Sequence, residues 1–333
     1  MALKNQKTTL QNKEPSFLGS AAFVTKYRQL ADSMQFSRQP LLITGESGVG
    51  KTQLARYLCY HSAENGKPCK TIWLNEIPEE LLESELFGHC DDHGNKYEGR
   101  IKLNDKGTII LKGITRLPGH LQAKLLRLIE TGNFERIGDD NLVQVNVRLI
   151  CTTNKNLRQL TTENTFRSDL YCLLSANQII VQPLRNRPED IRTLSQYFIS
   201  ETAKRQKKNL NGIASNAMRV LQSYAWPGNV RELKAEIENA VSKSDPQQKT
   251  LRIEFLSPKV RFNFSQLGVP DTIQLFDKVK SIERQLIIEA IEENGGNKSV
   301  AARALGVKHR TLYQKMKSLG IPLNFNNSEK IEA

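Results

Sequence analysis

An eight-residue glycine-rich segment, GESGVGKT, carries the residue types that bind phosphate. It follows the apolar run PLLIT and opens the helical pattern TQLARYL, which is the context expected of a GxxxxGK[ST] loop. Glycines let backbone N–H groups converge on phosphate oxygens, a lysine adds a point charge, and a threonine hydroxyl can reach Mg²⁺. The segment therefore predicts a nucleotide-binding loop made of Gly45, Glu46, Ser47, Gly48, Val49, Gly50, Lys51 and Thr52.

A second segment, GTIILKGI, predicts a buried strand that ends on Lys112 and Gly113. Hydrolysis in a P-loop protein uses a strand-end aspartate that helps to hold Mg²⁺ and a neighbouring acid that polarises the attacking water. Lys112 can do neither, because an ammonium group repels a metal ion and cannot accept a proton at neutral pH. We therefore expect that the chain is not an enzyme, that ATP or ADP is a ligand and not a fuel, and that Mg²⁺ binding is doubtful.

Two interpretations of Lys112 remain open at this point. Either the catalytic site has decayed and the side chain points to solvent, or its charge replaces that of the metal ion and the loop holds nucleotide without turnover. An active ATPase with relocated acids is an alternative, and the candidate acids are Asp91, Asp92 and Glu98. The segment HCDDH, residues 89–93, has metal-capable side chains, but its continuation is typical of a turn, and we predict no metal site.

Composition limits the class of protein. Hydrophobic residues make up 38% of the 333 residues and charged residues 25%, with a formal net charge of +13, which is typical of a globular chain with an anionic partner. No apolar run approaches the roughly 20 residues of a membrane span, and the first residues lack a signal-peptide core. We therefore expect no membrane association and a cytoplasmic location. The five scattered cysteines predict free thiols.

The C-terminal segment combines a helix–turn–helix pattern with basic residues. NKSVAARALGVKHRTLYQKMKSLGI predicts a short helix, a turn at Gly306 and a second helix. No acid interrupts the charges from Lys298 to Lys317, as expected of a surface that binds the phosphates of double-stranded DNA. The second helix would enter the major groove. The residues predicted to contact DNA are Lys298, Lys308, His309, Arg310, Thr311, Gln314 and Lys315.

Short β-type runs alternate with helical patterns before this segment, which predicts an α/β fold with a parallel sheet. From about residue 190 the pattern is helical and predicts a small subdomain. The predicted order is a disordered arm over residues 1–15, the α/β domain with this subdomain over 16–243, a linker over 244–275, an all-α DNA-binding domain over 276–322 and a tail over 323–333.

Several motifs occur in the order seen in one family. GESGVGKT, ESELFGH, FRSDLYCLL and YAWPGNVRELK resemble the NtrC-type AAA+ activators of sigma-54 RNA polymerase over residues 17–243. The resemblance implies an AAA+ P-loop parallel sheet with a helical lid. It places Asn154 at the first nucleotide sensor, Arg231 at the second sensor in the lid, and Arg167 at a trans-acting arginine finger. The last 45 or so residues resemble the Fis-type helix–turn–helix that ends such proteins.

Three departures from the family pattern affect the coupling of hydrolysis to sigma-54. The family's GAFTGA loop is replaced by a shorter segment, the second arginine finger falls on Leu173, and the strand-end acids are missing. The chain resembles the tyrosine repressor in lacking GAFTGA, and we expect it to resemble the phage-shock activator in having no sensory domain before the AAA+ core.

These departures define the expected function. We expect a sequence-specific DNA-binding transcriptional regulator that forms a homodimer or higher oligomer at the bacterial nucleoid. Its partner would be the housekeeping RNA polymerase holoenzyme more than the sigma-54 form. An inactive subunit that assembles with a competent AAA+ activator remains an alternative.

Overall fold

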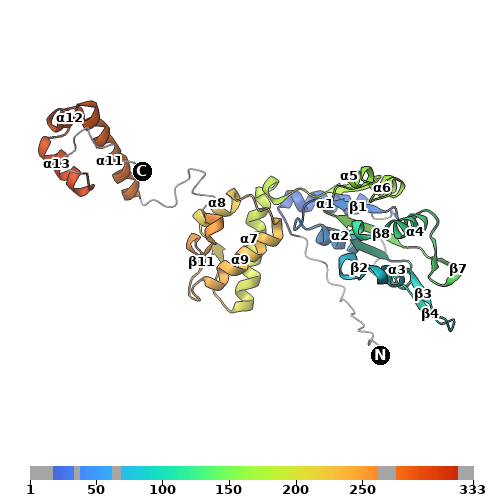
Figure 1. The fold of residues 1–333 in the computed structure, drawn as a ribbon. Coiled ribbons are helices and arrows are strands. Elements are labelled where there is room, and N and C mark those ends of the chain that lie inside the picture. Colours follow the sequence, from blue (N-terminus) through green and yellow to red (C-terminus); the bar gives the residue numbers. More distant parts are fainter. Residues whose placement is uncertain (1–17, 34–37, 62–68, 262–274, 322–333) are drawn as a thin grey trace. The chain divides into compact units, whose positions relative to one another are not determined.

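The structure is a computed structural model that describes residues 18–33, 38–61, 69–261 and 275–321 (Figure 1). The chain forms two compact units, Met1–Asn263 and Phe264–Ala333, which are described separately. The predicted arm over residues 1–15 and the predicted tail over residues 323–333 lie outside the described residues.

A five-stranded parallel sheet forms the centre of the first unit. In spatial order its strands are β2 (Cys69–Trp73), β5 (Thr108–Lys112), β8 (Arg148–Thr153), β1 (Leu41–Thr44) and β9 (Gln178–Ile180). The register places Lys112 beside Trp73 on one side and beside Thr152 on the other. The carboxyl ends of parallel strands meet at one edge, so the strand that ends on Lys112 delivers this side chain to the edge where ligands bind. The predicted α/β fold is confirmed.

Alternating side chains of β5 belong to two separate hydrophobic cores. Ile109 and Leu111 pack in the core that contains the helices α3 to α6, whereas Ile110 packs in the core that contains α1 and α2. Successive side chains of a strand point to opposite faces, so an uninterrupted apolar run is buried on both. The bounds of these helices are α1 (Ala21–Ser33), α2 (Lys51–Tyr60), α3 (Leu82–Phe87), α4 (Gly119–Thr131), α5 (Leu157–Thr162) and α6 (Ser168–Ser175).

Two antiparallel hairpins extend from this core. They consist of β3 (Gly88–Cys90) with β4 (Lys96–Glu98), and of β6 (Asn133–Arg136) with β7 (Asp139–Gln144). Short 3₁₀ turns complete the connections: η1 (Leu74–Glu76), η2 (Glu79–Leu81), η3 (Lys102–Asn104), η4 (Ile114–Arg116) and η5 (Leu184–Asn186).

The lid subdomain follows the sheet and is mainly helical. Its elements are α7 (Pro188–Gln206), β10 (Gly212–Ile213), α8 (Ser215–Ser223), α9 (Asn229–Lys243), β11 (Thr250–Leu251) and η6 (Ile253–Phe255). The lid continues past the predicted boundary at residue 243, because β11 pairs with β10 and the side chains of Leu251, Leu256 and Val260 are buried. The linker prediction is corrected to this extent, and its residues 262–274 lie outside the described part.

The second unit is all-α, with α11 (Leu275–Glu293), α12 (Lys298–Ala304) and α13 (His309–Ser318). Ile287, Ile291, Leu312 and Met316 form its core with neighbouring apolar residues. The turn between α12 and α13 contains Gly306 at φ +66°, a conformation that favours glycine. The predicted helix–turn–helix is confirmed.

Cys59 at the end of α2 and Cys69 at the start of β2 form a disulfide. The prediction of free thiols is therefore wrong for these two residues, which the fold brings together although their spacing has no pairing pattern. Cys90, Cys151 and Cys172 are free. In the described part of the chain, no helix combines the length and apolarity needed to cross a membrane.

Candidate functional site

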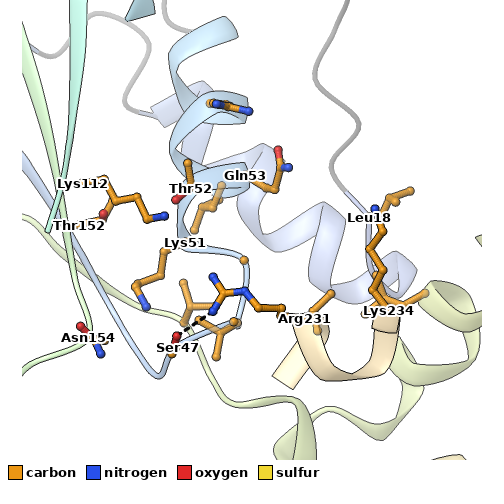
Figure 2. A pocket seen from close by; sticks show the side chains of 18 of the residues that line it. Leu18, Ser47, Lys51, Thr52, Gln53, Lys112, Thr152, Asn154, Arg231 and Lys234 are labelled. Carbon is orange, nitrogen blue, oxygen red and sulfur yellow. Dashed lines mark hydrogen bonds between the residues drawn. The ribbon is translucent and has the colours of Figure 1, made fainter. Parts of the chain in front are cut away.

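The glycine-rich loop connects β1 to α2 at the carboxyl edge of the sheet (Figure 2). Gly48 has φ +80° and Gly50, at the N-cap of α2, has φ +104°. A Cβ atom at position 48 would collide with the carbonyl oxygen of Gly228 in the lid. The lid therefore approaches the loop so closely that only glycine fits at position 48.

The loop lines a cavity of about 770 Å³ between the sheet edge and the lid. Lys112 at the end of β5, Asn154 after β8 and Arg231 on α9 also line this cavity, so the structure brings the three distant predicted residues to the loop. Gly45 and Glu46 are not part of the lining, although their carbonyl oxygens contact Lys51. The predicted residues that line the cavity are Ser47, Gly48, Val49, Gly50, Lys51, Thr52, Lys112, Asn154 and Arg231.

Lys51 is held against the backbone of its own loop. Its Nζ donates to the carbonyl oxygens of Gly45 and Glu46, at 2.7 Å each. Burial lowers the pKa of Lys51 to about 8, and the positive charges of Lys112 and Arg231 add to the effect. The site therefore holds more positive charge than its own acids neutralise.

Lys112 lines the cavity, and its side chain is half-buried. Its ammonium nitrogen is 3.4 Å from the centroid of the Trp73 ring on the neighbouring strand, a cation–π contact. Figure 2 shows the side chain extending from the sheet edge toward Thr52 and Lys51. Burial lowers the pKa of Lys112, and the charge of Arg231 lowers it further.

The lining of the cavity does not fit a magnesium ion. Mg²⁺ is usually held by carboxylates together with phosphate and water oxygens. Among the described residues that line the cavity, Glu201 on lid helix α7 is the sole acid, and the hydroxyl of Thr52 is adjacent to cations. The cationic side chains of the lining are Lys51, Arg56, Lys112, Arg187, Arg231 and Lys234.

The relocated acids proposed from the sequence lie elsewhere. Asp91 and Asp92 are in the turn of the β3–β4 hairpin and Glu98 is on β4, and none of them belongs to the cavity lining. Asp91 accepts hydrogen bonds from the backbone N–H groups of His93 and Asn95, so its carboxylate closes the turn. The predicted turn is present.

His89 also has a structural environment. Its Nδ1 lies 2.7 Å from the Ser84 hydroxyl, and its ring stacks on that of Tyr97 at 4.5 Å. Within the described ranges, no group of three His, Cys, Asp or Glu side chains is arranged to hold a metal ion.

Asn229 ties the lid to the loop, and sequence reasoning missed this residue. Its Nδ2 donates to the Ser47 carbonyl oxygen (3.0 Å) and to a Glu46 carboxylate oxygen (3.1 Å), and its Oδ1 accepts from the Leu184 N–H (2.8 Å). The side chain is fully buried, with φ +53°. An asparagine after glycine, immediately before a helical pattern, was the available signal, because asparagine tolerates this backbone conformation.

Two further lid contacts act on the same loop. The Val230 N–H donates to the Gly48 carbonyl oxygen at 3.1 Å, and the Arg231 guanidinium donates to the Ser47 hydroxyl at 3.2 Å. Arg185 forms an ion pair with Glu46, and hydrogen bonds from Arg185 and then Asn229 lower the pKa of Glu46 to about 2. Glu46 therefore connects the loop to Arg185 and to the lid residue Asn229.

Arg187 is a second residue that the sequence did not reveal. It is buried at the start of α7, where its guanidinium binds Asp190 at 2.9 Å and the Val49 carbonyl oxygen at 2.8 Å. The guanidinium also lies 4.4 Å from the Phe23 ring centroid. The lining of the cavity also contains apolar and aromatic side chains, among them Leu18, Phe23, Leu194, Tyr197 and Phe198.

The predicted DNA-contact residues occupy the second unit. Lys308, His309, Arg310 and Gln314 are exposed at the N-cap and along α13, whereas Thr311 and Lys298 are half-buried. Lys308 makes no side-chain hydrogen bond that caps α13. Lys315 forms an ion pair with Glu283 on α11, so it is less available to a phosphate than the sequence suggests.

Comparisons with known proteins cover all of these parts. Residues 17–180 match the sigma-54 interaction domain, residues 185–268 the AAA+ ATPase lid domain, and residues 278–319 the Fis family of bacterial regulatory proteins. The chain is 35% identical over 315 residues to nitrogen fixation protein AnfA of Azotobacter vinelandii, which covers 93% of this chain and 58% of AnfA. It is 36% identical over 295 residues to regulatory protein AtoC of Escherichia coli K12, which covers 86% of this chain and 63% of AtoC.

Among solved structures, NtrX from Brucella abortus in complex with ATP is 30% identical, with a TM-score of 0.66, and the match covers 92% of this chain and 70% of NtrX. NtrX in complex with ADP matches with a TM-score of 0.67 at 29% identity, and the same shares of the two chains are covered. The chain belongs to the NtrC-type AAA+ family. It spans less than two thirds of the length of AnfA and of AtoC.

Membership of the NtrC-type family corrects one expectation. The expectation that the chain is not an enzyme is wrong, because the family is one of AAA+ ATPases and the ATPase lid domain matches residues 185–268. The expectation was wrong because it inferred the activity of the whole module from two residues at the end of one strand, Lys112 and Gly113.

The arginine that the NtrC-type resemblance assigns to a neighbouring site lies away from the large cavity. Arg167 is the N-cap residue of α6, and its exposed guanidinium forms two hydrogen bonds with Asp169, at 2.7 and 3.1 Å. It lines a separate cavity of about 250 Å³ together with Gln122. A role in trans stays a prediction.

The lid–loop contacts lead to a stability prediction. We expect Asn229→Ala to lower the free energy of unfolding by about 2–4 kcal/mol, because it leaves the buried Leu184 N–H without its acceptor and places alanine at positive φ. Urea unfolding followed by circular dichroism measures the change. Asn229→Gly removes the same hydrogen bonds without the backbone strain, so it separates the two contributions. The exposed lid residue Asn211, changed to alanine, is the control, and a loss below about 1 kcal/mol for Asn229→Ala contradicts the assignment.

Proposed function

We propose that this chain is a sequence-specific DNA-binding transcriptional regulator whose AAA+ module binds ATP or ADP and which acts without sigma-54. The observation that carries the proposal is the exposed basic face of α13 in a unit that matches the Fis family. DNA binding also agrees with the net charge of +13 and with a location at the nucleoid in the cytoplasm.

Residues near the start of α13 are suited to read base edges. Arg310 can bind guanine with two hydrogen bonds, and Gln314 can bind adenine in the same way. Lys308 and Lys298 would contact phosphates, which fixes the position of the helix but does not discriminate between sequences. The roles of Arg310, Gln314 and Lys308 follow from their exposure and side-chain chemistry, and that of Lys298 follows from its charge.

Nucleotide binding is supported by the shape and charge of the large cavity. NtrX, a relative at 30% identity, has been crystallised with ATP. In this chain the loop and the cations of the lining would hold the phosphates, and the apolar side chains of the lining, such as Phe23, would receive the base. Turnover is expected to be slow, because the described lining places no carboxylate at the end of β5.

Independence from sigma-54 is proposed from the β3–β4 hairpin. Residues 88–98 form a short hairpin closed by Asp91, in the region where the resemblance to the family expects the GAFTGA loop. The RNA polymerase partner would then be the housekeeping holoenzyme. A dimer or higher oligomer is proposed from the exposed Arg167 and from Leu286 on α11, whose side chain is 51% exposed.

In vitro transcription tests the proposed polymerase partner. The template is a supercoiled plasmid that carries a DNA site selected for binding to this protein. The amount of transcript should change when the protein is added to polymerase that contains the housekeeping sigma factor, with sigma-54 absent. The matched reaction contains sigma-54 holoenzyme and a sigma-54 promoter. A response confined to the sigma-54 reaction contradicts this part of the proposal and leaves DNA binding intact.

The DNA-contact assignment predicts a loss of affinity and of specificity. We expect Arg310→Ala to weaken operator binding by about 10- to 100-fold and to reduce discrimination at one base pair, as for other bidentate base contacts. Fluorescence anisotropy over a series of salt concentrations measures both quantities. Arg219→Ala removes an exposed lid arginine and is the control. Equal effects of the two variants contradict the assignment.

The lowered pKa of Lys51 predicts a pH dependence of nucleotide binding. Below about pH 8 the free protein already carries the charge on Lys51, whereas above it binding must take up a proton. Affinity for ATP should therefore fall above pH 8, by at most about tenfold per pH unit. Calorimetry between pH 7 and 9.5 measures this fall, and Lys51→Arg, which stays charged, should lack the decline that starts near pH 8. A constant wild-type affinity across this range contradicts the prediction.

A further inference from the structure

We propose that the cavity binds a nucleoside triphosphate in its metal-free form, with the ammonium group of Lys112 supplying positive charge in place of Mg²⁺. This inference rests on the proposed nucleotide binding and specifies the form of the ligand. It concerns the residues of this chain that depart from the usual P-loop arrangement.

The first argument is the position of the ammonium group. Lys112 is the last residue of β5, and the register fixes it between Trp73 and Thr152. The ammonium nitrogen lies 3.4 Å from the centroid of the Trp73 ring, and the side chain extends toward Thr52 and Lys51 (Figure 2). In P-loop proteins the residue at this strand end helps to hold the metal beside the outer phosphates. Lys112 therefore presents a charge close to the place where those phosphates would lie.

The second argument is the charge balance. Burial and then the charge of Arg231 lower the pKa of Lys112, and burial and then the charge of Lys112 lower that of Lys51. When neighbouring positive charges lower the pKa of a cationic side chain, an anion placed between them stabilises the charged form. A metal-free triphosphate has more negative charge than its magnesium complex, so it matches this lining better.

The third argument concerns the acids near these cations. Glu76 raises the pKa of Lys112 but is exposed and lies outside the cavity lining. Glu46 is engaged by Arg185 and Asn229, and Glu201 lies on lid helix α7. Thr52 could give one oxygen ligand, but Lys112 would repel a divalent ion beside it. The described residues thus favour the anion alone over its metal complex.

Calorimetric titration of ATP into the full chain tests the inference, once in EDTA and once in excess MgCl₂. The wild type should bind at least as tightly in EDTA as in Mg²⁺. Lys112→Asp should reverse this preference, with a change of at least about tenfold in the ratio of the two dissociation constants, as expected for a reversed charge close to the phosphates. Lys70→Asp places the same charge change at an exposed position near the start of β2 and should leave the ratio unchanged.

Lys112→Gln is a second variant that tests the inference if Lys112→Asp does not fold. It removes the charge without adding an acid and should weaken binding in EDTA more than binding in Mg²⁺. Thermal unfolding compares the fold of each variant with that of the wild type. A second readout uses Trp73, one of two tryptophans, because displacement of Lys112 from the indole by ATP in EDTA should change the fluorescence, and Trp73→Phe should abolish that change.

The outcomes separate this inference from the proposed function. Wild-type binding that requires Mg²⁺ overturns the inference and leaves nucleotide binding in place. An unchanged ratio in both Lys112 variants also overturns it. Absence of ATP binding in both media overturns nucleotide binding and, with it, this inference.

Discussion

The contact between the Lys112 ammonium and the Trp73 ring sets the chemistry of the large cavity. Both residues end adjacent parallel strands, so the geometry of the sheet brings them together. A lysine free to rotate would direct its charge into water, where screening makes it weak. Held over the indole and half-buried, the same charge acts on Lys51 and on any anion in the loop. The strand end therefore carries a positively charged side chain at the position where the resemblance to the family implies an acid.

The lid depends on a second constraint, the close approach of its backbone to the loop. Gly48 has no room for a side chain because Gly228 lies against it, and Asn229 bonds to the carbonyl oxygen of the preceding Ser47. Glu46 joins the same network through Arg185. A change in the loop backbone would therefore be transmitted directly to the start of α9. Arg231, two residues after Asn229 on the same helix, lines the cavity and donates to the Ser47 hydroxyl of the loop.

Sequence reasoning recovered the parts of the molecule that are encoded by local patterns. The loop, the β5 run and the turn at Gly306 each have a residue pattern with one physical meaning. Contacts made by tertiary approach were missed, because nothing in the spacing of Cys59 and Cys69 indicates that α2 ends beside the start of β2. The other missed contacts have the same origin, and they involve Asn229, Arg187, the ion pair between Lys315 and Glu283, and the continuation of the lid through β11.

The two proposed anion sites use one physical arrangement. In each, a helix begins without a side-chain cap: α2 follows Gly50 and α13 follows Lys308. The first N–H groups of a helix need acceptors, and phosphate oxygens can supply them while they interact with the positive end of the helix dipole. By contrast, α12 is capped by Asn297, which accepts from two of its own N–H groups. In a helix–turn–helix the second helix enters the groove, so in the proposed complex the start of α13 lies near phosphate oxygens that can accept from its first N–H groups.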